Sequence, residues 1–182
     1  SYETLKQVLG FREELAKMEQ LDFDPIHMEK AYNQERSEWQ SLFSKEDKGM
    51  EEDKPCWIAP DLSEGQWWDM CLPDYWEKNG LKNFDGVVWF RRSFEIPAEW
   101  IGKPLKLNLG MIDDEDITYF NGVEIARGAG YMTPRTYTIP AKLVKAGKAV
   151  LAVRVSDFGG EGGIHGKAED LYVEADGKRI SL

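Results

Sequence analysis

The sequence has no long apolar run, few cysteines and few histidines, and each shortage excludes a class of protein. No stretch approaches the roughly 20 apolar residues that a transmembrane helix needs, and the charged N-terminal segment lacks the pattern of a signal peptide. The two cysteines and two histidines among 182 residues have no zinc-site spacing. A net charge of −10 repels nucleic acid and anionic membranes, so neither is expected as a partner.

The cysteines and the aromatic residues leave two questions open. Cys56 and Cys71 can form a disulfide bond in an exported protein or remain two thiols. Aromatic residues make up 12% of the chain, and seven of them are tryptophans. Many of these rings belong to a core, but such an excess is also typical of sugar-binding faces, where flat rings stack on pyranose rings.

Residues 1–54 are predicted to form a helical hairpin followed by an acidic linker. Between Tyr2 and Leu21 the apolar residues recur at helical spacing. Asp24-Pro25 has the pattern of an N-cap followed by proline at the first helical position, and a second helix is expected from Pro25 to about Phe43. The segment Ser44–Lys54 is rich in charged residues and is expected to be a solvated linker.

Residues 55–182 have the pattern of an antiparallel β-sandwich or barrel. Short segments, several with alternating apolar and polar residues, are separated by turn signals; they are 87–94, 105–109, 117–120, 123–126, 135–139, 150–155, 171–175 and 178–182. Asn121-Gly122 is a strong hairpin signal, because both residues tolerate positive φ. Trp89, Phe90 and Phe94 have the size expected of core residues.

An acidic cluster lies where one predicted strand ends, at Asp113, Asp114, Glu115 and Asp116. Carboxylates this close repel one another unless backbone N–H groups, an arginine or a cation hold them. Three roles stay open: turn capping by Asp113 or Asp116, a structural Ca²⁺ site, and a polar rim that faces a sugar. No other cofactor is expected.

The segment Gly159–Gly166 is rich in glycine, which lets the backbone approach another group closely. It is either a flexible crossover or a loop that lies against a catalytic domain, with His165 near the cleft. The candidates for a second wall are Gly128, Gly130, Tyr131 and Arg135, and the Tyr131 ring either stacks on a sugar or belongs to the core. Arg154 and Asp157 are expected to form an ion pair at the sandwich edge.

Four stretches, taken in this order, resemble a known family: 85–100, 105–125, 134–155 and 156–166. They resemble the jelly-roll, galactose-binding-like domain of the sialate O-acetylesterases, which is inserted within an SGNH-type esterase domain. The resemblance implies a jelly-roll β-sandwich at 55–182. It also implies a larger enzyme, in the periplasm or outside the cell, that removes O-acetyl esters from sialic acids. A similar outline occurs in the sugar-binding domain of β-galactosidase-like glycosidases.

The chain itself lacks a recognisable catalytic group. It has no Gly-x-Ser-x-Gly segment and no serine in another nucleophile context. Asp24 and His27 match an Asp-x-x-His motif, but Asp24 is assigned to helix capping and there is no nucleophile for the histidine to serve. We therefore expect no catalytic residues in this chain.

The interpretation that follows is a non-catalytic carbohydrate-binding or scaffolding domain of a sialate O-acetylesterase-like enzyme. Its expected partners are the esterase domain of the same polypeptide and a glycan. The candidate substrate-binding residues are Asp113, Asp114, Asp116, Tyr131, Arg135 and His165. Two alternatives remain: the sugar-binding domain of a β-galactosidase-like glycoside hydrolase, and a purely structural spacer.

Overall fold

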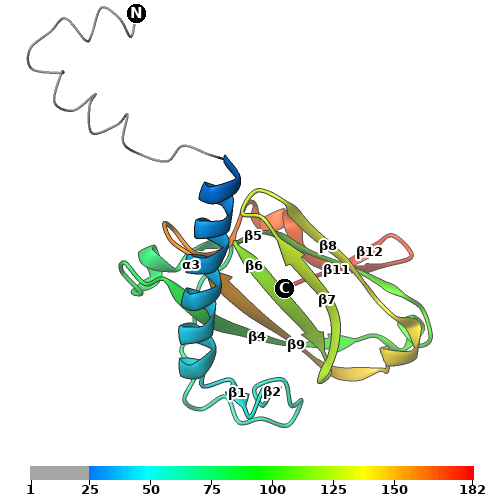
Figure 1. The fold of residues 1–182 in the computed structure, drawn as a ribbon. Coiled ribbons are helices and arrows are strands. Elements are labelled where there is room, and N and C mark those ends of the chain that lie inside the picture. Colours follow the sequence, from blue (N-terminus) through cyan, green and yellow to red (C-terminus); the bar gives the residue numbers. More distant parts are fainter. Residues whose placement is uncertain (1–24) are drawn as a thin grey trace, which may run out of the picture. The chain divides into compact units, whose positions relative to one another are not determined.

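The structure is a computed structural model that describes residues 25–182. Asp24 and the first predicted helix lie outside the described residues. The chain divides into two compact units between Glu46 and Asp47, and each is described by itself. In the first unit, helix α3 (Pro25–Glu46) confirms the second predicted helix and extends it by three residues (Figure 1). No helix in the described part is long and apolar enough to cross a membrane.

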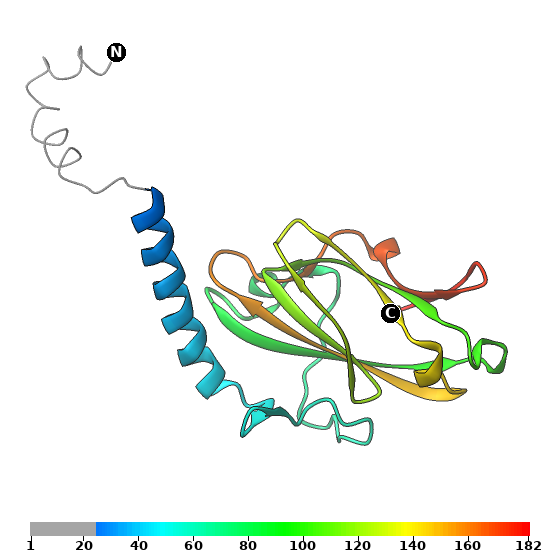
Figure 2. The same ribbon diagram turned by 45° about the vertical axis from the view of Figure 1, so that its right-hand side comes forward.

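The second unit consists of two antiparallel sheets packed face to face (Figure 2). The first sheet has the strand order β4 (Gly86–Ile96), β9 (Gly147–Asp157), β6 (Glu115–Phe120) and β7 (Val123–Ala129). Two short strands, β1 (Met50–Glu51) and β2 (Lys54–Pro55), form a separate hairpin.

The second sheet is built around β5 (Leu105–Asp113). Strand β8 (Pro134–Ile139) pairs with one side of β5, and β11 (Leu171–Ala175) and β10 (Gly163–His165) follow each other along the opposite side. The outer strands are β12 (Lys178–Ser181), next to β11, and β3 (Asp74–Tyr75), next to β10. Every pairing among the described strands is antiparallel, which confirms the predicted mainly-β jelly-roll sandwich.

The predicted hairpin at Asn121-Gly122 is present between β6 and β7. Asn121 and Gly122 have φ values of 47° and 79°, the left-handed geometry that a tight two-residue turn requires. The Asn121 side chain also accepts a hydrogen bond at 2.8 Å from the backbone N–H of Val150 on β9. The turn is therefore tied to the neighbouring strand as well as shaped by its own residues.

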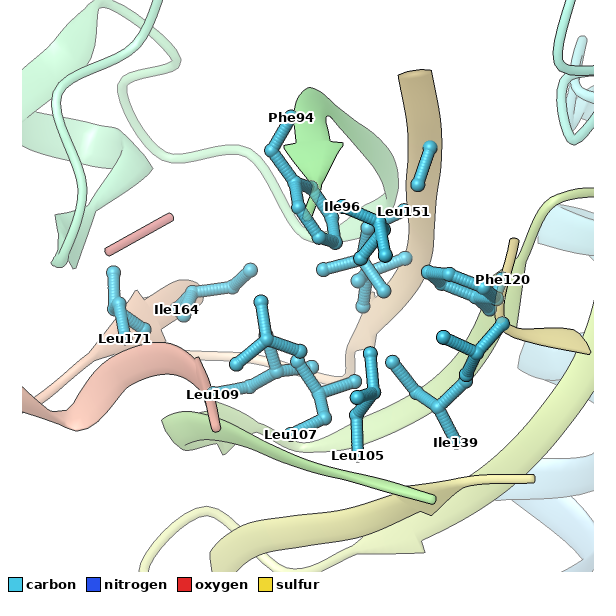
Figure 3. Packing of buried hydrophobic residues seen from close by; sticks show 14 of the residues in the cluster. Phe94, Ile96, Leu105, Leu107, Leu109, Phe120, Ile139, Leu151, Ile164 and Leu171 are labelled. Carbon is cyan, nitrogen blue, oxygen red and sulfur yellow. The ribbon is translucent and has the colours of Figure 1, made fainter. Parts of the chain in front are cut away.

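The main core lies between the two sheets, where alternate residues of each strand point inward. In Figure 3, Leu105, Leu107 and Leu109 of β5 face Phe94 and Ile96 of β4. Phe90 also packs against this core, as predicted, but Trp89 does not. Because successive strand residues point to opposite faces, Trp89 lies on the outer face of the first sheet.

A second, smaller core covers that outer face. Trp89, Tyr119 and Ala152 are buried beneath partly buried apolar residues, most of them from the segment 47–67: Met50, Trp57, Ile58, Trp67, Val87 and Ile117. Asp47 belongs to this layer and is buried, so the expected solvated linker is wrong at that position. The predicted pair of Arg154 with Asp157 is also wrong, because residues three apart on a strand face opposite sides and Arg154 pairs with Asp47 instead.

Candidate functional site

Three aspartates converge at one end of the sandwich. Asp113 is the last residue of β5, Asp114 follows it, and Asp157 is the last residue of β9. Each offers a carboxylate oxygen, and these three oxygens lie within 4.8 Å of one another. Two members of this group, which we call the aspartate cluster, come from the predicted acidic stretch. The sequence analysis did not predict Asp157 as a site residue. Its position at the end of a strand, before a glycine-rich loop, is a sequence feature that could have indicated it.

The aspartate cluster is poorly neutralised by the protein around it. Asp157 is 0% exposed; its Oδ1 accepts a hydrogen bond from the Gly159 N–H at 3.0 Å, while its Oδ2 is buried without a partner. Asp114 accepts one from the N–H of Phe158 at 2.9 Å. Among the described residues, none of the three aspartates forms an ion pair. An unpartnered buried carboxylate oxygen is costly, so this arrangement needs an explanation.

Burial shifts the protonation of two members of the cluster. It raises the pKa of Asp157 to about 6, against the lowering effect of the Gly159 N–H. Burial, followed by the charge of Asp114, raises the pKa of Asp113 to about 7. Asp113 also forms a side-chain hydrogen bond with Asp114, so a proton held by Asp113 is shared within the cluster and lowers the repulsion between the two residues.

Tyr131 and His165, two of the predicted site residues, lie together beside this end. His165 donates from Nε2 to the carbonyl oxygen of Tyr131 at 2.9 Å, and its ring stacks on Tyr75 with centroids 4.9 Å apart. The Tyr131 side chain is exposed. The N–H of Gly130 donates to the carbonyl oxygen of Asp114 at 2.7 Å, which joins this wall to the aspartate cluster.

The other two predicted residues, Asp116 and Arg135, face the interior. They are 2% and 1% exposed, and Arg135 Nε donates to Asp116 at 2.7 Å. The remaining guanidinium nitrogens donate to backbone carbonyl oxygens: those of Ile112, Asp114, Gly130 and Thr133. Tyr137 and Thr118 complete the pairing by donating to Asp116. The pair of Arg135 and Asp116 therefore holds the backbone in place beside Tyr131 and next to Asp113 and Asp114.

The glycine-rich segment is more ordered than a flexible crossover. Its residues Gly163–His165 form β10, between β3 and β5. A Cβ atom on Gly162 would collide with the Trp76 ring and lie 2.7 Å from Asp157 Oδ2, so only glycine fits beside the cluster.

Three carboxylate oxygens are also a suitable partial ligand set for Ca²⁺. The calcium interpretation stays a prediction, with Asp157 as an additional candidate ligand.

A scan against protein-family models and a search of curated proteins find no match. Among solved structures, the fold resembles part of Bacteroides uniformis β-glucuronidase 2, with 24% identity and a TM-score of 0.52. It also resembles part of a glycosyl hydrolase family 2 member from Bacteroides cellulosilyticus, with 23% identity and a TM-score of 0.52. These matches cover 59% and 58% of this chain but 14% and 17% of those chains. At such identities the likeness shows the fold alone.

The comparison corrects the family resemblance read from the sequence. These two structures are a β-glucuronidase and a glycosyl hydrolase family 2 member, not esterases, so the assignment to the sialate O-acetylesterases and to an SGNH-type esterase is wrong. The alternative interpretation, a sugar-binding domain of a glycoside hydrolase, is compatible with this likeness in fold.

Proposed function

We propose that the β-sandwich is the sugar-binding domain of a larger glycoside hydrolase and binds sugar hydroxyls through the aspartate cluster. The observation that carries the proposal is a group of three carboxylates that form no ion pair with a described residue. Asp157 is covered by the protein beside Gly162 and Trp76, so a ligand would bind its two partly buried neighbours, Asp113 and Asp114. Hydrogen bonds from ligand hydroxyls to a charged acceptor are stronger than those between neutral groups.

The side chain of Tyr131, beside the aspartate cluster, is suited to contact the rest of a sugar ring. Tyr131 presents an exposed ring that can stack on the C–H face of a pyranose while the carboxylates bind the hydroxyl edge. Asp116 and Arg135 act indirectly in this proposal, because they fix the backbone positions of Asp114 and Gly130. Such positioning keeps the acceptors at the correct distance from the ligand before it binds.

The domain is proposed to be non-catalytic. Glycoside hydrolysis uses two carboxyl groups on opposite sides of the scissile bond, roughly 5 to 10 Å apart. The carboxylates of the aspartate cluster are grouped at one end of the sandwich, with oxygens within 4.8 Å of one another and Asp157 fully buried, so no scissile bond fits between them. The hydrolytic groups would then come from a catalytic domain of the same polypeptide, which is the proposed partner. A location in the periplasm or outside the cell fits a glycan ligand.

Saturation-transfer NMR with methyl β-galactoside, methyl β-glucoside and methyl β-glucuronide tests the binding site on the intact chain. We expect at least one of these sugars to bind, and binding to be lost in Asp114→Asn and weakened in Tyr131→Ala. Asp176→Asn, in the exposed turn between β11 and β12, is the control and should bind as the wild type does. Binding of none of the three sugars, or equal binding by Asp114→Asn, would contradict the proposed site.

The non-catalytic assignment has a separate test. Incubation of the chain with the 4-nitrophenyl β-galactoside, β-glucoside and β-glucuronide should release no nitrophenol. Turnover that disappears in Asp157→Asn or Asp113→Asn would show instead that the cluster performs the hydrolysis.

A further inference from the structure

A tryptophan-lined groove runs beside strand β4, apart from the aspartate cluster. Its volume is about 800 Å³, within the range of ligand-binding pockets. Four of the seven tryptophans line it: Trp57, Trp67, Trp68 and Trp89. A second cavity of about 380 Å³ shares three of these rings and continues inward between the sheets. None of the aspartates of the cluster lines either cavity.

Three of the four rings of this groove, those of Trp57, Trp67 and Trp89, are held in place by the protein. Trp57 packs edge-on against Trp67 and Trp89, with centroids 5.3 and 6.2 Å away. The nearly buried guanidinium of Arg91 lies 5.8 Å from the Trp67 centroid and donates to the carbonyl oxygens of Trp57 and Ala59 at 2.8 and 3.0 Å. The segment that carries the tryptophans is thus fastened to β4. A groove formed in advance loses little conformational freedom when a ligand enters.

Trp68 differs from the other three tryptophans because it is 59% exposed. A large exposed indole that lines a cavity is a common anchor for a ligand. The groove also contains Ser63 and Gln66, whose side chains form no hydrogen bond with another described residue. A hydroxyl and an amide next to flat rings supply both contacts that a pyranose needs, hydrogen bonds at its edge and stacking on its face.

From this arrangement we propose a second carbohydrate site, in which the tryptophan groove binds pyranose rings of a glycan chain with Trp68 as the stacking platform. Ser63 and Gln66 bind hydroxyl groups at the rim. This site goes beyond the sugar-binding function proposed above, because it shares no residue with the aspartate cluster. Its proposed ligand is a polysaccharide chain, whereas the proposed ligand of the aspartate cluster is a single sugar unit. A glycan is favoured over an apolar peptide because the unengaged groups at the rim are polar.

Native gel electrophoresis in soluble polysaccharide tests this proposal with hydroxyethyl cellulose, xylan, galactan and laminarin in the gel. We expect at least one polymer to retard the intact chain. Trp68→Ala should lower the affinity at least about tenfold, the change that follows from losing one stacked ring, while Trp68→Phe should keep most of it. Asp176→Asn, in the exposed turn between β11 and β12, lies outside both sites and should be retarded as the wild type is.

Three results would overturn the second site. The first is migration unaffected by all four polymers, and the second is equal retardation of Trp68→Ala with an unchanged melting temperature. The third is a concentration-dependent dimer in sedimentation that Trp68→Ala abolishes, which would make the groove an interface between copies. Binding of monosaccharides at the aspartate cluster is measured separately by NMR, so failure of either site leaves the other standing.

Discussion

Asp47 and Arg154 are 107 residues apart in sequence, yet Arg154 Nε lies 2.7 Å from Asp47 Oδ2. The other carboxylate oxygen of Asp47 accepts hydrogen bonds from Trp89 Nε1 at 2.8 Å and from the Gly49 N–H at 2.9 Å. The two charged side chains are 1% and 14% exposed. One carboxylate therefore fastens the outer layer, which carries the tryptophan groove, to the sheet beneath it.

Asp47→Ala should destabilise the protein strongly. The substitution leaves Arg154 and the Trp89 N–H without an acceptor in a place that water hardly reaches, which costs about 3 kcal/mol of unfolding free energy. Urea denaturation followed by tryptophan fluorescence measures this loss. Lys103→Ala is the control: it breaks the exposed pair with Asp176, which is worth less than about 1 kcal/mol. Similar losses in the two variants would contradict the structural role of Asp47.

Arg135→Lys should be nearly as damaging, although it keeps the charge. Lysine cannot reproduce the planar fork with which Arg135 reaches Asp116 and four backbone carbonyl oxygens, so a loss of about 3 kcal/mol is expected. Arg127→Lys provides the matched control, because Arg127 makes a two-pronged pair with Glu124 on the surface. Thermal unfolding should give Arg135→Lys a clearly lower melting temperature than Arg127→Lys. An Arg135→Lys variant as stable as the wild type would show that the guanidinium fork is dispensable.

The sandwich was predictable because its signals are local. Period-two alternation and the Asn121-Gly122 turn specify strands and hairpins from a few neighbouring residues. The outer layer was not predictable from such signals, since its strands are only two residues long and its stability depends on Asp47 reaching a strand 107 residues later. A charged segment with little periodicity resembles a linker until its distant partner is known.

The candidate site was predictable in part. Asp113 and Asp114 stood out because adjacent acidic residues at a strand end repel one another. Asp157 did not, because only the pairing of β6 with β9 brings it near them. Asp116 is buried against Arg135, while its neighbours Asp113 and Asp114 are only partly buried and face Asp157. Sequence spacing alone carries no information about that difference.

Gly162→Ala should disturb the aspartate cluster. The new methyl group would overlap the Trp76 ring and crowd Asp157 Oδ2, so overpacking should cost about 2 kcal/mol. Gly65→Ala is a matched control, because the nearest atom to its added Cβ would be 3.7 Å away. Differential scanning calorimetry of both variants tests the prediction. If Gly162→Ala melted no lower than Gly65→Ala, the close packing around Trp76 would be absent in solution.

The stability of the protein should depend on pH through Asp157. Its pKa is 3.8 in the absence of the fold and about 6 in the folded protein, where burial disfavours the charge. The folded state therefore binds the proton more tightly, and the resulting stabilisation is complete below the lower value and lost as the pH rises through the higher one. Asp157→Asn removes this dependence.

The stability of Asp157→Asn should consequently rise relative to the wild type between about pH 4 and about pH 8, by an amount on the order of 2 kcal/mol. Urea denaturation of both proteins across that range measures the difference. Asp176→Asn, on an exposed turn, should change the pH dependence of stability little over the same range. A difference between wild type and Asp157→Asn that stays constant with pH would mean that Asp157 is solvated.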